Sequence, residues 1–493
     1  MNIRLMKRKL SIASFRKATH FLFFSSRNVV NYQLSIVLLL FLVAACGKAR
    51  RPGLSDSELF AQQVTADSIR QVLIDFDAET YEVPPGIKYT ESRAVDPANP
   101  PVVIDIEMAL HKGVEEIQLS SIGKSVTYIK ATIPKDMRVL DFIIRDDTLL
   151  VSCRGQMTQC IVPYTLDGKF LNFIWEITPK GIAKKYHPDI EEEPMPEISP
   201  QTGTRPPPPP PPPNLSSRNK GDEIIYNIDF DHTGKKVHYT ITRWQDTEHP
   251  EYRKHIIALL NGAQQAVTSE KFSDAPHNTY YQPPAGWVHV YKTLDQWFKK
   301  SPWSLITFSS NGDTLCRFAN YNPVTPVSVS AGSPPERITA YFYNDRLTFR
   351  TDYADTIFRM TAPDRIVPVY AINCGKYKLF ATEGLRNQIE NKVYIEKIRE
   401  TQRFLFVSIN APTRKKQVLV FDKQQQTLRL HGNEYLSNDI DHGPAFYPEK
   451  IMPDGKTMVC SYGSTYFQNN PSDLMDRLFP SIAKNSVVFM IVK

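Results

Sequence analysis

"VLDFIIRDDTLLVSC" (residues 139–153) is a stretch in which apolar residues alternate with polar ones, and QCIVPYTLDGKFLNFIWEI (residues 159–177) continues the pattern. Alternation with a period of two places one face of an extended strand against a core, so both stretches predict half-buried β-strands. Asp167-Gly168 interrupts the second stretch, and Thr233-Gly234, Asn344-Asp345 and Asp454-Gly455 are further turn candidates along the chain. Asn, Asp and Gly tolerate the positive φ of a tight hairpin turn. The region therefore predicts antiparallel strands joined by short turns.

The same pattern recurs along most of the remaining chain. It is found in KKVHYTITRW (235–244), WSLITFSSNGDTLCRF (303–318), RITAYFYNDRLTFRTDYADTIFRM (337–360), RFLFVSI (403–409), KQVLVFDKQQQTLRLH (416–431) and KTMVCSYG (456–463). Strands do not alternate with long helices, which disfavours a parallel α/β sheet. The strand groups recur at intervals of about 40–50 residues, a spacing compatible with four-stranded propeller blades. We therefore expect an all-β fold, a β-propeller over residues 103–493.

The chain ends in the apolar segment SVVFMIVK (486–493). In a ring of sheets such a strand can pair beside the first blade, which leaves no open edge. The C-terminus is thus the predicted point of ring closure.

The N-terminal region has the pattern of an export signal over residues 1–46. The apolar run LSIVLLLFLVAA (34–45) is too short for a comfortable membrane span and follows basic residues without any acidic one. The segment Leu42-Val43-Ala44-Ala45-Cys46 resembles the lipobox of bacterial lipoproteins, which implies acylation of Cys46 and anchoring to a membrane. An ordinary cleaved signal or an uncleaved anchor is the alternative.

Charge gives no support for nucleic-acid binding. The formal charge of +7 equals the seven basic residues that precede Cys46, and the remaining chain carries 52 basic and 52 acidic residues. No acidic run follows Cys46, so we expect the outer membrane, on the periplasmic side, as the location; the cell surface is the alternative.

Two segments differ from the strand pattern. Residues 47–102 form a lead-in with a helix expected over 55–76 and an extended, proline-containing part after it. Residues 188–221 include eight consecutive prolines, which must be extended polyproline II. We interpret this insert as a loop between two blades that acts as a spacer; docking onto an aromatic groove of a partner is the alternative.

Six cysteines are present, and five remain if Cys46 is acylated. Cys153 and Cys160 are the only close pair, and an exported protein permits a disulfide between them. The alternative interpretation, which we favour, is that all five are small buried apolar residues.

Several segments carry a resemblance to a known family. They are TLLVSCRGQMTQCIVPYTLDGKFLNFI (148–174), GDTLCRFANYNPV (312–324), YNDRLTFRTDYADTIFRM (343–360), VPVYAINCGKYKL (367–379) and YLSNDIDHGPAFYP (435–448). The first resembles one blade of the NHL type, and together they are similar to the six-bladed β-propeller lipoproteins of Bacteroides and its relatives. The resemblance implies six blades and no established reaction.

The segment YLSNDIDHGPAFYP contains the candidate residues Asp439, Asp441 and His442. Two alternate carboxylates face one side of a strand and can bind a hard cation such as Ca²⁺, which needs six to eight oxygens. This stretch alone supplies too few. Asp-His-Gly-Pro also forms a good turn, and structural capping is the interpretation we favour.

Further polar clusters allow a structural and a functional interpretation. Arg350 and Asp355 either brace neighbouring strands or contact a ligand. The run Asp229 to His232, with His238 close by, fits a hairpin tip with solvated polar groups. Motifs of nucleophilic hydrolases, phosphate-binding loops and zinc hydrolases are absent from the sequence.

Two functional hypotheses remain. The first is a binding or scaffold module that presents a propeller face to a glycan, a peptide or an envelope partner. The second is a propeller enzyme of the lactonase, lyase or hydrolase type, with a divalent cation near the central channel. Asp355, Asp439 and Asp441 are its candidate ligands, because propeller sites assemble from several blades.

Overall fold

The computed structural model describes residues 100–493 with gaps. The gaps are 156–157, 188–189, 194–220, 244–252, 261–263, 269–278, 282–286, 291–302, 309–313, 320–337, 352, 381–382 and 384–388. Cys46, the predicted signal peptide, the predicted helix over 55–76 and the proline run all lie outside the described residues. None of the described helices is long and apolar enough to span a membrane.

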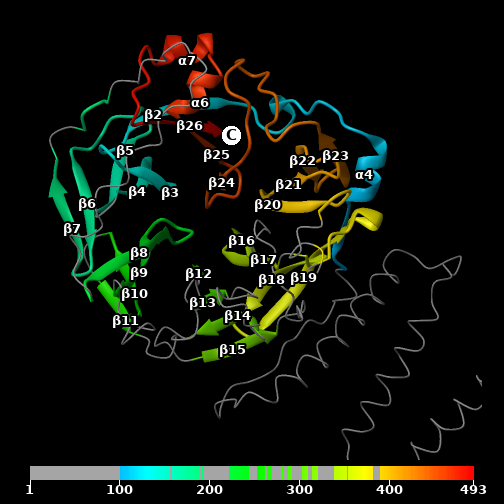
Figure 1. Cartoon of the computed structure of the whole chain (residues 1–493), viewed down its shortest axis with the longest axis horizontal. Coiled ribbons are helices and arrows are strands. Elements are labelled where there is room, and N and C mark those ends of the chain that lie inside the picture. The colour runs from blue at the N-terminus through cyan, green and yellow to red at the C-terminus, as the bar shows by residue number, and fades with distance from the viewer. Residues whose placement is uncertain are drawn as a thin grey trace, which may run out of the picture. The chain divides into compact units, whose positions relative to one another are not determined.

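The strands of the described residues form six sheets, numbered here in the order in which the chain forms them (Figure 1). The first contains β3 (Arg138–Arg145), β4 (Thr148–Arg154), β5 (Gln159–Thr165), β6 (Phe173–Thr178) and β7 (Gly181–Tyr186). The second contains β8 (Glu223–Phe230), β9 (Lys236–Arg243), β10 (Arg253–Leu259) and β11 (Gln264–Thr268). The third contains β12 (Thr279–Tyr281), β13 (Trp287–Val290), β14 (Trp303–Phe308) and β15 (Thr314–Ala319).

The last three sheets follow the same up-and-down order. The fourth contains β16 (Ile338–Tyr343), β17 (Arg346–Thr351), β18 (Thr356–Ala362) and β19 (Arg365–Asn373), with β1 (Val102–Asp105) added in parallel beside β19. The fifth contains β20 (Tyr394–Glu400), β21 (Phe404–Asn410), β22 (Lys416–Asp422) and β23 (Thr427–His431). The sixth contains β24 (Lys450–Ile451), β25 (Met458–Gly463), β26 (Ser486–Val492) and β2 (Val126–Thr132).

Neighbouring sheets bury their apolar faces against each other. One apolar cluster joins the sixth, first and second sheets, and three others join the third to the fourth, the fourth to the fifth and the fifth to the sixth. The sheets surround a central axis with the first strand of each hairpin series innermost, as Figure 1 shows. This arrangement is a β-propeller, which confirms the predicted all-β class.

Ring closure depends on two strands from opposite ends of the described chain. β2 pairs antiparallel with β26 along its whole length, from Val126 opposite Val492 to Thr132 opposite Ser486. Every residue of β26 is buried. The C-terminal strand was expected beside the first blade; instead the last sheet receives a strand from the N-terminal side, which covers the outer edge of β26.

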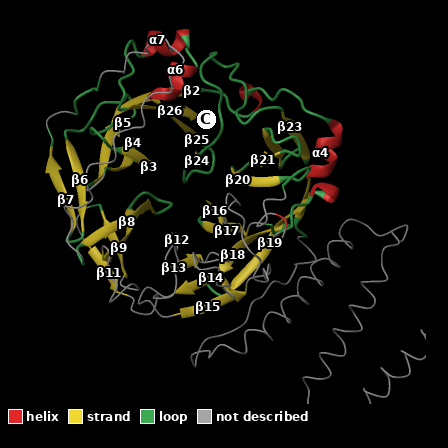
Figure 2. Ribbon diagram, viewed as in Figure 1, coloured by secondary structure: helices red, strands yellow, loops and turns green. Residues whose placement is uncertain are grey.

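The N-terminal segment 102–132, which we call the strap, links the outer sides of the fourth, fifth and sixth sheets. After β1 it forms α4 (Ile106–Lys112), whose N-terminus is capped by Asp105, and the short 3-10 helix η1 (Leu119–Ser121). The amide of Ile117 donates to Nδ1 of His431 at 3.0 Å. The other short helices, η4 (Gly375–Tyr377), α6 (Ser464–Asn469) and α7 (Asp473–Leu478), follow β19 or β25, and Figure 2 shows α4, α6 and α7 at the periphery.

The turns confirm the hairpin predictions that fall on described residues. Asn344 (φ 48°) and Asp345 (φ 58°) connect β16 to β17 with two consecutive left-handed residues, the requirement of a type I′ turn. Gly168, Gly234 and Gly455 also have positive φ in the predicted turns.

The five described cysteines are buried free thiols. Cys153 and Cys160 face each other across β4 and β5 without a disulfide between them. The interpretation of these cysteines as small buried residues therefore agrees with the structure.

We predict that Phe489→Ala lowers the free energy of unfolding by about 3–5 kcal/mol, because truncating a buried Phe leaves a cavity. Phe489 is fully buried, and its ring centroid lies 5.0 Å from that of Phe142 in the first sheet. Urea denaturation measures the change. Tyr186→Ala is the control, since Tyr186 is 77% exposed and should cost little. Equal effects of the two variants would contradict the importance of this contact.

Candidate functional site

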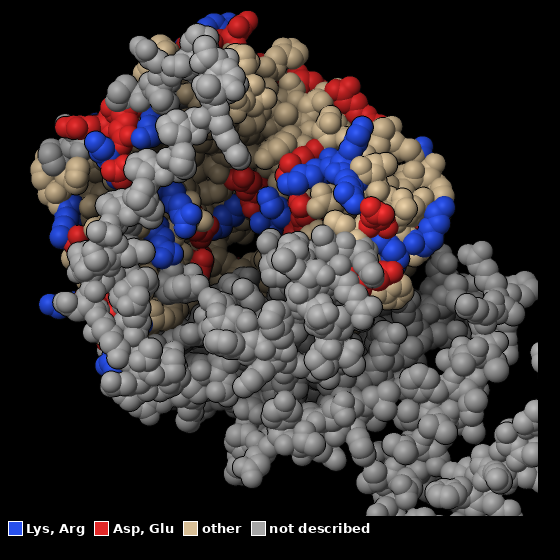
Figure 3. All heavy atoms as spheres, viewed as in Figure 1, with Lys and Arg blue, Asp and Glu red and all other residues tan. Residues whose placement is uncertain are grey.

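A cavity of about 370 Å³ lies at the axis of the propeller. Its walls come from β3, β8, β16, β20 and the segment around β24, so five of the six sheets contribute residues. Because inner strands run beside the axis, side chains from distant parts of the sequence face one space. Figure 3 shows acidic and basic side chains gathered around the central hollow.

Asp141 joins three sheets at the cavity wall. Its Oδ1 lies 2.5 Å from Nζ of Lys450 and accepts the amide of Phe142 at 2.8 Å. Its Oδ2 accepts the amide of Phe230 at 3.3 Å. The first, second and sixth sheets therefore meet at one carboxylate, whose charge Lys450 balances.

Asp229 lies beside this pair on β8. Burial, and to a smaller extent the Asp141 carboxylate, raise the pKa of Asp229 to about 7, although Lys450 acts in the opposite direction. Among the described residues, no hydrogen bond or ion pair engages the Asp229 side chain. A carboxyl with such a pKa can exchange a proton near neutral pH, a property common at functional sites.

Two histidines add polar groups to the cavity. His232 Nε2 lies 2.9 Å from Oδ1 of Asp345, and its ring stacks on Phe342 with centroids 4.7 Å apart. His238 on β9 is buried and also lines the cavity.

The prediction of a solvated tip for the hairpin after β8 is wrong. Asp231 is buried and accepts the Lys236 amide and the Thr233 hydroxyl. The physical reason is the neighbouring sheet: a Cβ at Gly234 would lie 3.0 Å from the side chain of Ile143 on β3. The first sheet thus covers the tip.

Arg399 lies on β20, on the opposite side of the axis from β8 in Figure 1. Its Nε donates to the Glu449 carbonyl at 2.6 Å, and its Nη1 donates to the Ile398 carbonyl at 2.9 Å. No ion pair joins Arg399 to a carboxylate among the described residues. The Glu449 carboxylate accepts the amide and the hydroxyl of Ser461.

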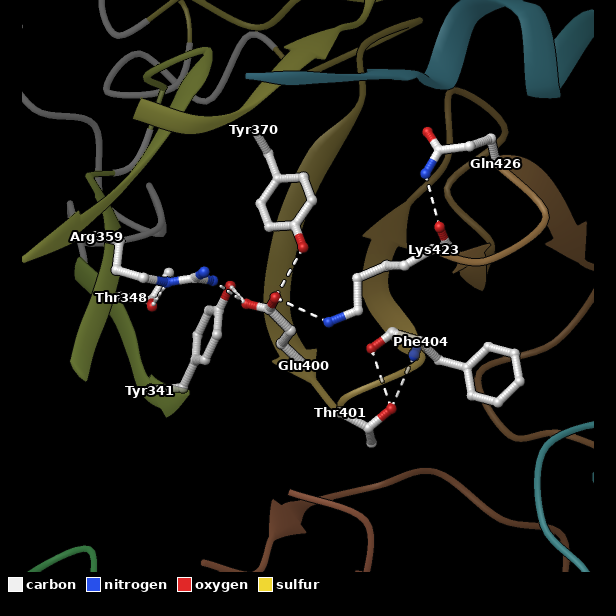
Figure 4. A network of polar contacts seen from close by, with 9 residues as sticks. All are labelled: Tyr341, Thr348, Arg359, Tyr370, Glu400, Thr401, Phe404, Lys423 and Gln426. Atoms are coloured by element: carbon white, nitrogen blue, oxygen red, sulfur yellow. Dashed lines mark hydrogen bonds and ion pairs between the residues drawn. The ribbon is translucent and has the colours of Figure 1, made fainter. Parts of the chain in front are cut away.

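Glu400 is the centre of the polar network drawn in Figure 4. Its side chain, 1% exposed, accepts hydrogen bonds from the hydroxyls of Tyr341 (3.0 Å) and Tyr370 (2.7 Å). It also pairs with Nη2 of Arg359 (2.6 Å) and Nζ of Lys423 (3.1 Å). Burial and the Glu400 charge raise the pKa of both tyrosines, which keeps them protonated donors.

This network has a structural consequence for the cavity. Tyr341, Arg359 and Tyr370 belong to the fourth sheet, whereas Glu400 and Lys423 belong to the fifth sheet and the turn after β22. The four donors satisfy the Glu400 carboxylate and thereby fix the fourth and fifth sheets against each other. The network also positions β20, the strand from which Arg399 lines the cavity.

The structure places Asp439, Asp441 and His442 at the strap, outside the residues that line the cavity. Asp439 accepts the Ser120 amide at 2.9 Å, and Asp441 accepts the Tyr128 hydroxyl at 3.0 Å. His442 has φ 58° in the turn, and at the next position, Gly443, a Cβ would lie 2.1 Å from the Tyr128 hydroxyl. These contacts hold the strap, including its strand β2, to the loop after the fifth sheet.

Arg350 and Asp355 form a separate group in the fourth sheet. Arg350 is buried and donates from Nε to the Ala354 carbonyl at 2.8 Å. Asp355 pairs with Lys378. The structure therefore does not bring the five predicted candidates together.

Sequence reasoning missed the residues that do converge. Asp141, Arg399, Glu400 and Lys450 are not among the residues that the sequence pattern predicts for a site, and the pattern predicts a solvated tip for Asp229. Their one shared feature in the sequence is that each lies in, or at the end of, the first strand of a sheet. In the propeller this first strand is the one next to the axis. Among the described residues, no three His, Cys, Asp or Glu side chains form a group that could hold a metal ion.

We predict that Glu400→Gln lowers the free energy of unfolding by about 3–5 kcal/mol, because two buried cations lose their counter-charge. The matched control is Glu390→Gln, which breaks an ion pair with Arg414 whose side chains are 79% and 65% exposed. An exposed pair contributes at most about 1 kcal/mol. Urea denaturation of both variants measures the difference, and equal small losses would show that the network is dispensable.

Comparison with solved structures found distant similarities. A Bacteroides fragilis protein classed as exported shares 11% identity with this chain, covering 80% of this chain and 99% of that one, with a TM-score of 0.47. A DUF4221 family member from Bacteroides vulgatus shares 8% identity over 76% of this chain and 97% of that one, with a TM-score of 0.38. TolB from Acinetobacter baumannii shares 9% identity over 68% of this chain and 60% of that one, with a TM-score of 0.31.

None of the curated proteins compared with the chain matches it. The model of one family, described as "Domain of unknown function (DUF4933)", matches residues 217–468. This match begins just before the second sheet and ends in α6, so it includes most of the walls of the cavity. Because it covers more than half of the sequence, the chain belongs to the DUF4933 family.

Proposed function

We propose that this protein is a binding module of the cell envelope, in which a small polar ligand occupies the axial cavity. The observation that carries the proposal is the convergence of charged side chains from separate sheets on one space of about 370 Å³. This volume falls in the range of about 300–1,000 Å³ typical of small-molecule sites. A sugar or a short peptide segment is a ligand of suitable polarity.

The groups around the cavity support binding more than structural filling. Buried charges are costly unless they are paired, and Asp141 and Glu400 are paired with cations. Asp229 and Arg399, both partly buried at the cavity wall, have no ionic partner among the described residues. A ligand is the natural source of the missing partners.

We further propose that each of the six sheets is one blade of a six-bladed ring. Its support is the sheet order itself, with β2 completing a sixth sheet that would otherwise have three strands. A lipid anchor at Cys46 would hold this ring to the outer membrane, on the periplasmic side, as the lipobox-like segment suggests.

The cavity test uses Leu140, which lines the cavity from β3 and is 37% exposed. Leu140→Trp should fill part of the space and abolish ligand binding, whereas Leu140→Ala, the control, should preserve it. Thermal melts with a panel of sugars, short peptides, diamines and dicarboxylates detect binding, because a ligand of the folded state raises the melting temperature. If no compound stabilises the wild type, or if Leu140→Trp responds equally, the proposal fails.

The enzyme with a divalent cation is a second candidate, in which Asp141 and Asp229, which line the cavity from adjacent sheets, would contact the cation. The same melts with CaCl₂, MgCl₂ and EDTA test it. If a cation raises the melting temperature of the wild type but not that of Asp229→Asn, the enzyme is supported over the binding module.

The anchor has its own test. Mass spectrometry of the mature protein should find Cys46 as an acylated N-terminal residue, and Cys46→Ser should leave the protein soluble after cell fractionation. Cys374→Ser, which keeps Cys46, is the control and should remain in the membrane fraction. An unmodified Cys46 thiol in the exported protein would contradict the lipid anchor.

A further inference from the structure

We infer that the cavity ligand is a zwitterion, with an ammonium group held by Asp229 and a carboxylate held by Arg399. The inference rests on the proposed binding function and specifies the class of ligand. It follows from which charged side chains around the cavity already have partners for their polar groups and which keep groups without a partner among the described residues.

The anionic side of the site is Asp229. Lys450, which lowers the pKa of Asp229, forms its ion pair with Asp141 at 2.5 Å, so Asp229 has no ion pair of its own among the described residues. The ring centroids of Phe142 and Phe230 lie 5.9 and 5.8 Å from Lys450 Nζ, so this ammonium group is held between the Asp141 carboxylate and two aromatic rings. A carboxylate without an ion pair, such as that of Asp229, gains most from a charged donor such as an ammonium group.

The cationic side is Arg399. Two backbone carbonyls accept from its Nε and Nη1, which fixes the plane of the guanidinium group. The remaining N–H donors have no carboxylate partner among the described residues. A planar guanidinium held in this way binds a carboxylate with defined geometry.

The other charged groups at the cavity are already engaged. Glu400 is neutralised by Arg359 and Lys423, and Asp345 faces His232. Asp231 and Glu449 accept neutral donors from their own neighbourhoods. Asp229 on β8 and Arg399 on β20 therefore remain for a ligand, and Figure 1 shows these two strands on opposite sides of the axis.

A ligand with both charges satisfies both groups at once, whereas a singly charged ligand leaves one of them desolvated. Charge-assisted hydrogen bonds contribute about 1.5–3 kcal/mol each. Amino acids, ω-amino acids and short peptides with free termini have this chemistry. The distance between the two groups of the ligand must match the separation of Asp229 and Arg399.

The experiment compares four five-carbon probes of similar size: 5-aminopentanoate, 1,5-diaminopentane, glutarate and 1,5-pentanediol. A series of ω-amino acids with three to eight carbons is also measured. An unsuitable chain length of 5-aminopentanoate then cannot by itself prevent the detection of binding. Isothermal titration calorimetry should show that the best ω-amino acid binds at least about 10-fold tighter than the diamine, the dicarboxylate and the diol.

Two variants test which end of the ω-amino acid each residue binds. Asp229→Asn should weaken the best ω-amino acid by about 10-fold and leave glutarate unchanged, and Arg399→Gln should weaken it similarly while leaving the diamine unchanged. Circular dichroism and melting temperature confirm that both variants are folded. A variant that weakens all four probes equally would overturn the assignment of that residue.

The pH dependence separates Asp229 from its neighbours. Because the pKa of Asp229 is raised to about 7, affinity for the ω-amino acid should fall as the pH decreases below about 7, where Asp229 loses its negative charge. Asp141, Lys450, His232 and His238 face or flank Asp229 and remain in Asp229→Asn. That variant should therefore lack this decrease; a decrease of the same size in it would refute the role of Asp229.

The outcomes distinguish the inference from the proposed function. If a sugar or another compound binds in a manner that Leu140→Trp abolishes, and no ω-amino acid does, the zwitterion inference fails and the binding function stands. Equal affinity for 5-aminopentanoate and 1,5-pentanediol also overturns the inference. If no compound of either set binds, both are wrong.

Discussion

The whole propeller depends on the pairing of β2 with β26. Seven residue pairs join a strand that begins at Val126 to one that ends at Val492, and this ladder makes a four-stranded sheet from three C-terminal strands. Without it, β26 would carry an open, fully apolar edge. Three other features depend on this closure of the ring. They are the position of the strap, the apolar clusters shared by adjacent sheets and the enclosure of the axial cavity.

Polar contacts have two distinct uses in this molecule. At the periphery, Asp439 and Asp441 secure the strap through Ser120 and Tyr128. At the axis, Glu400 locks two sheets together with four donors, and the cost of burying that carboxylate is offset by two cations. Asp229 differs from these carboxylates, because no hydrogen bond or ion pair among the described residues engages its side chain.

The fold was predictable from the sequence because it rests on local signals. The alternation in 139–177 and the Asn344-Asp345 turn each specify strands and hairpins within a few residues. The candidate site was not predictable in this way. Asp141 and Lys450 are separated by about three hundred residues, and only the curvature of the ring brings them to 2.5 Å. Asp439 and Asp441 had the more conspicuous spacing, yet their partners lie in the strap, which the sequence pattern did not link to them.

The position of β2 and β26 at opposite ends of the described chain also has a consequence for biosynthesis. A polypeptide that leaves the ribosome, or crosses a membrane, from its N-terminus carries β2 unpaired until the last residues arrive. Each early sheet can form its own hairpins, but the ring is sealed only at the end of synthesis. A product that stops before Ser486 lacks β26 altogether, so a quality-control protease would meet an unsealed ring in which β2 and β25 lack the strand that pairs with both.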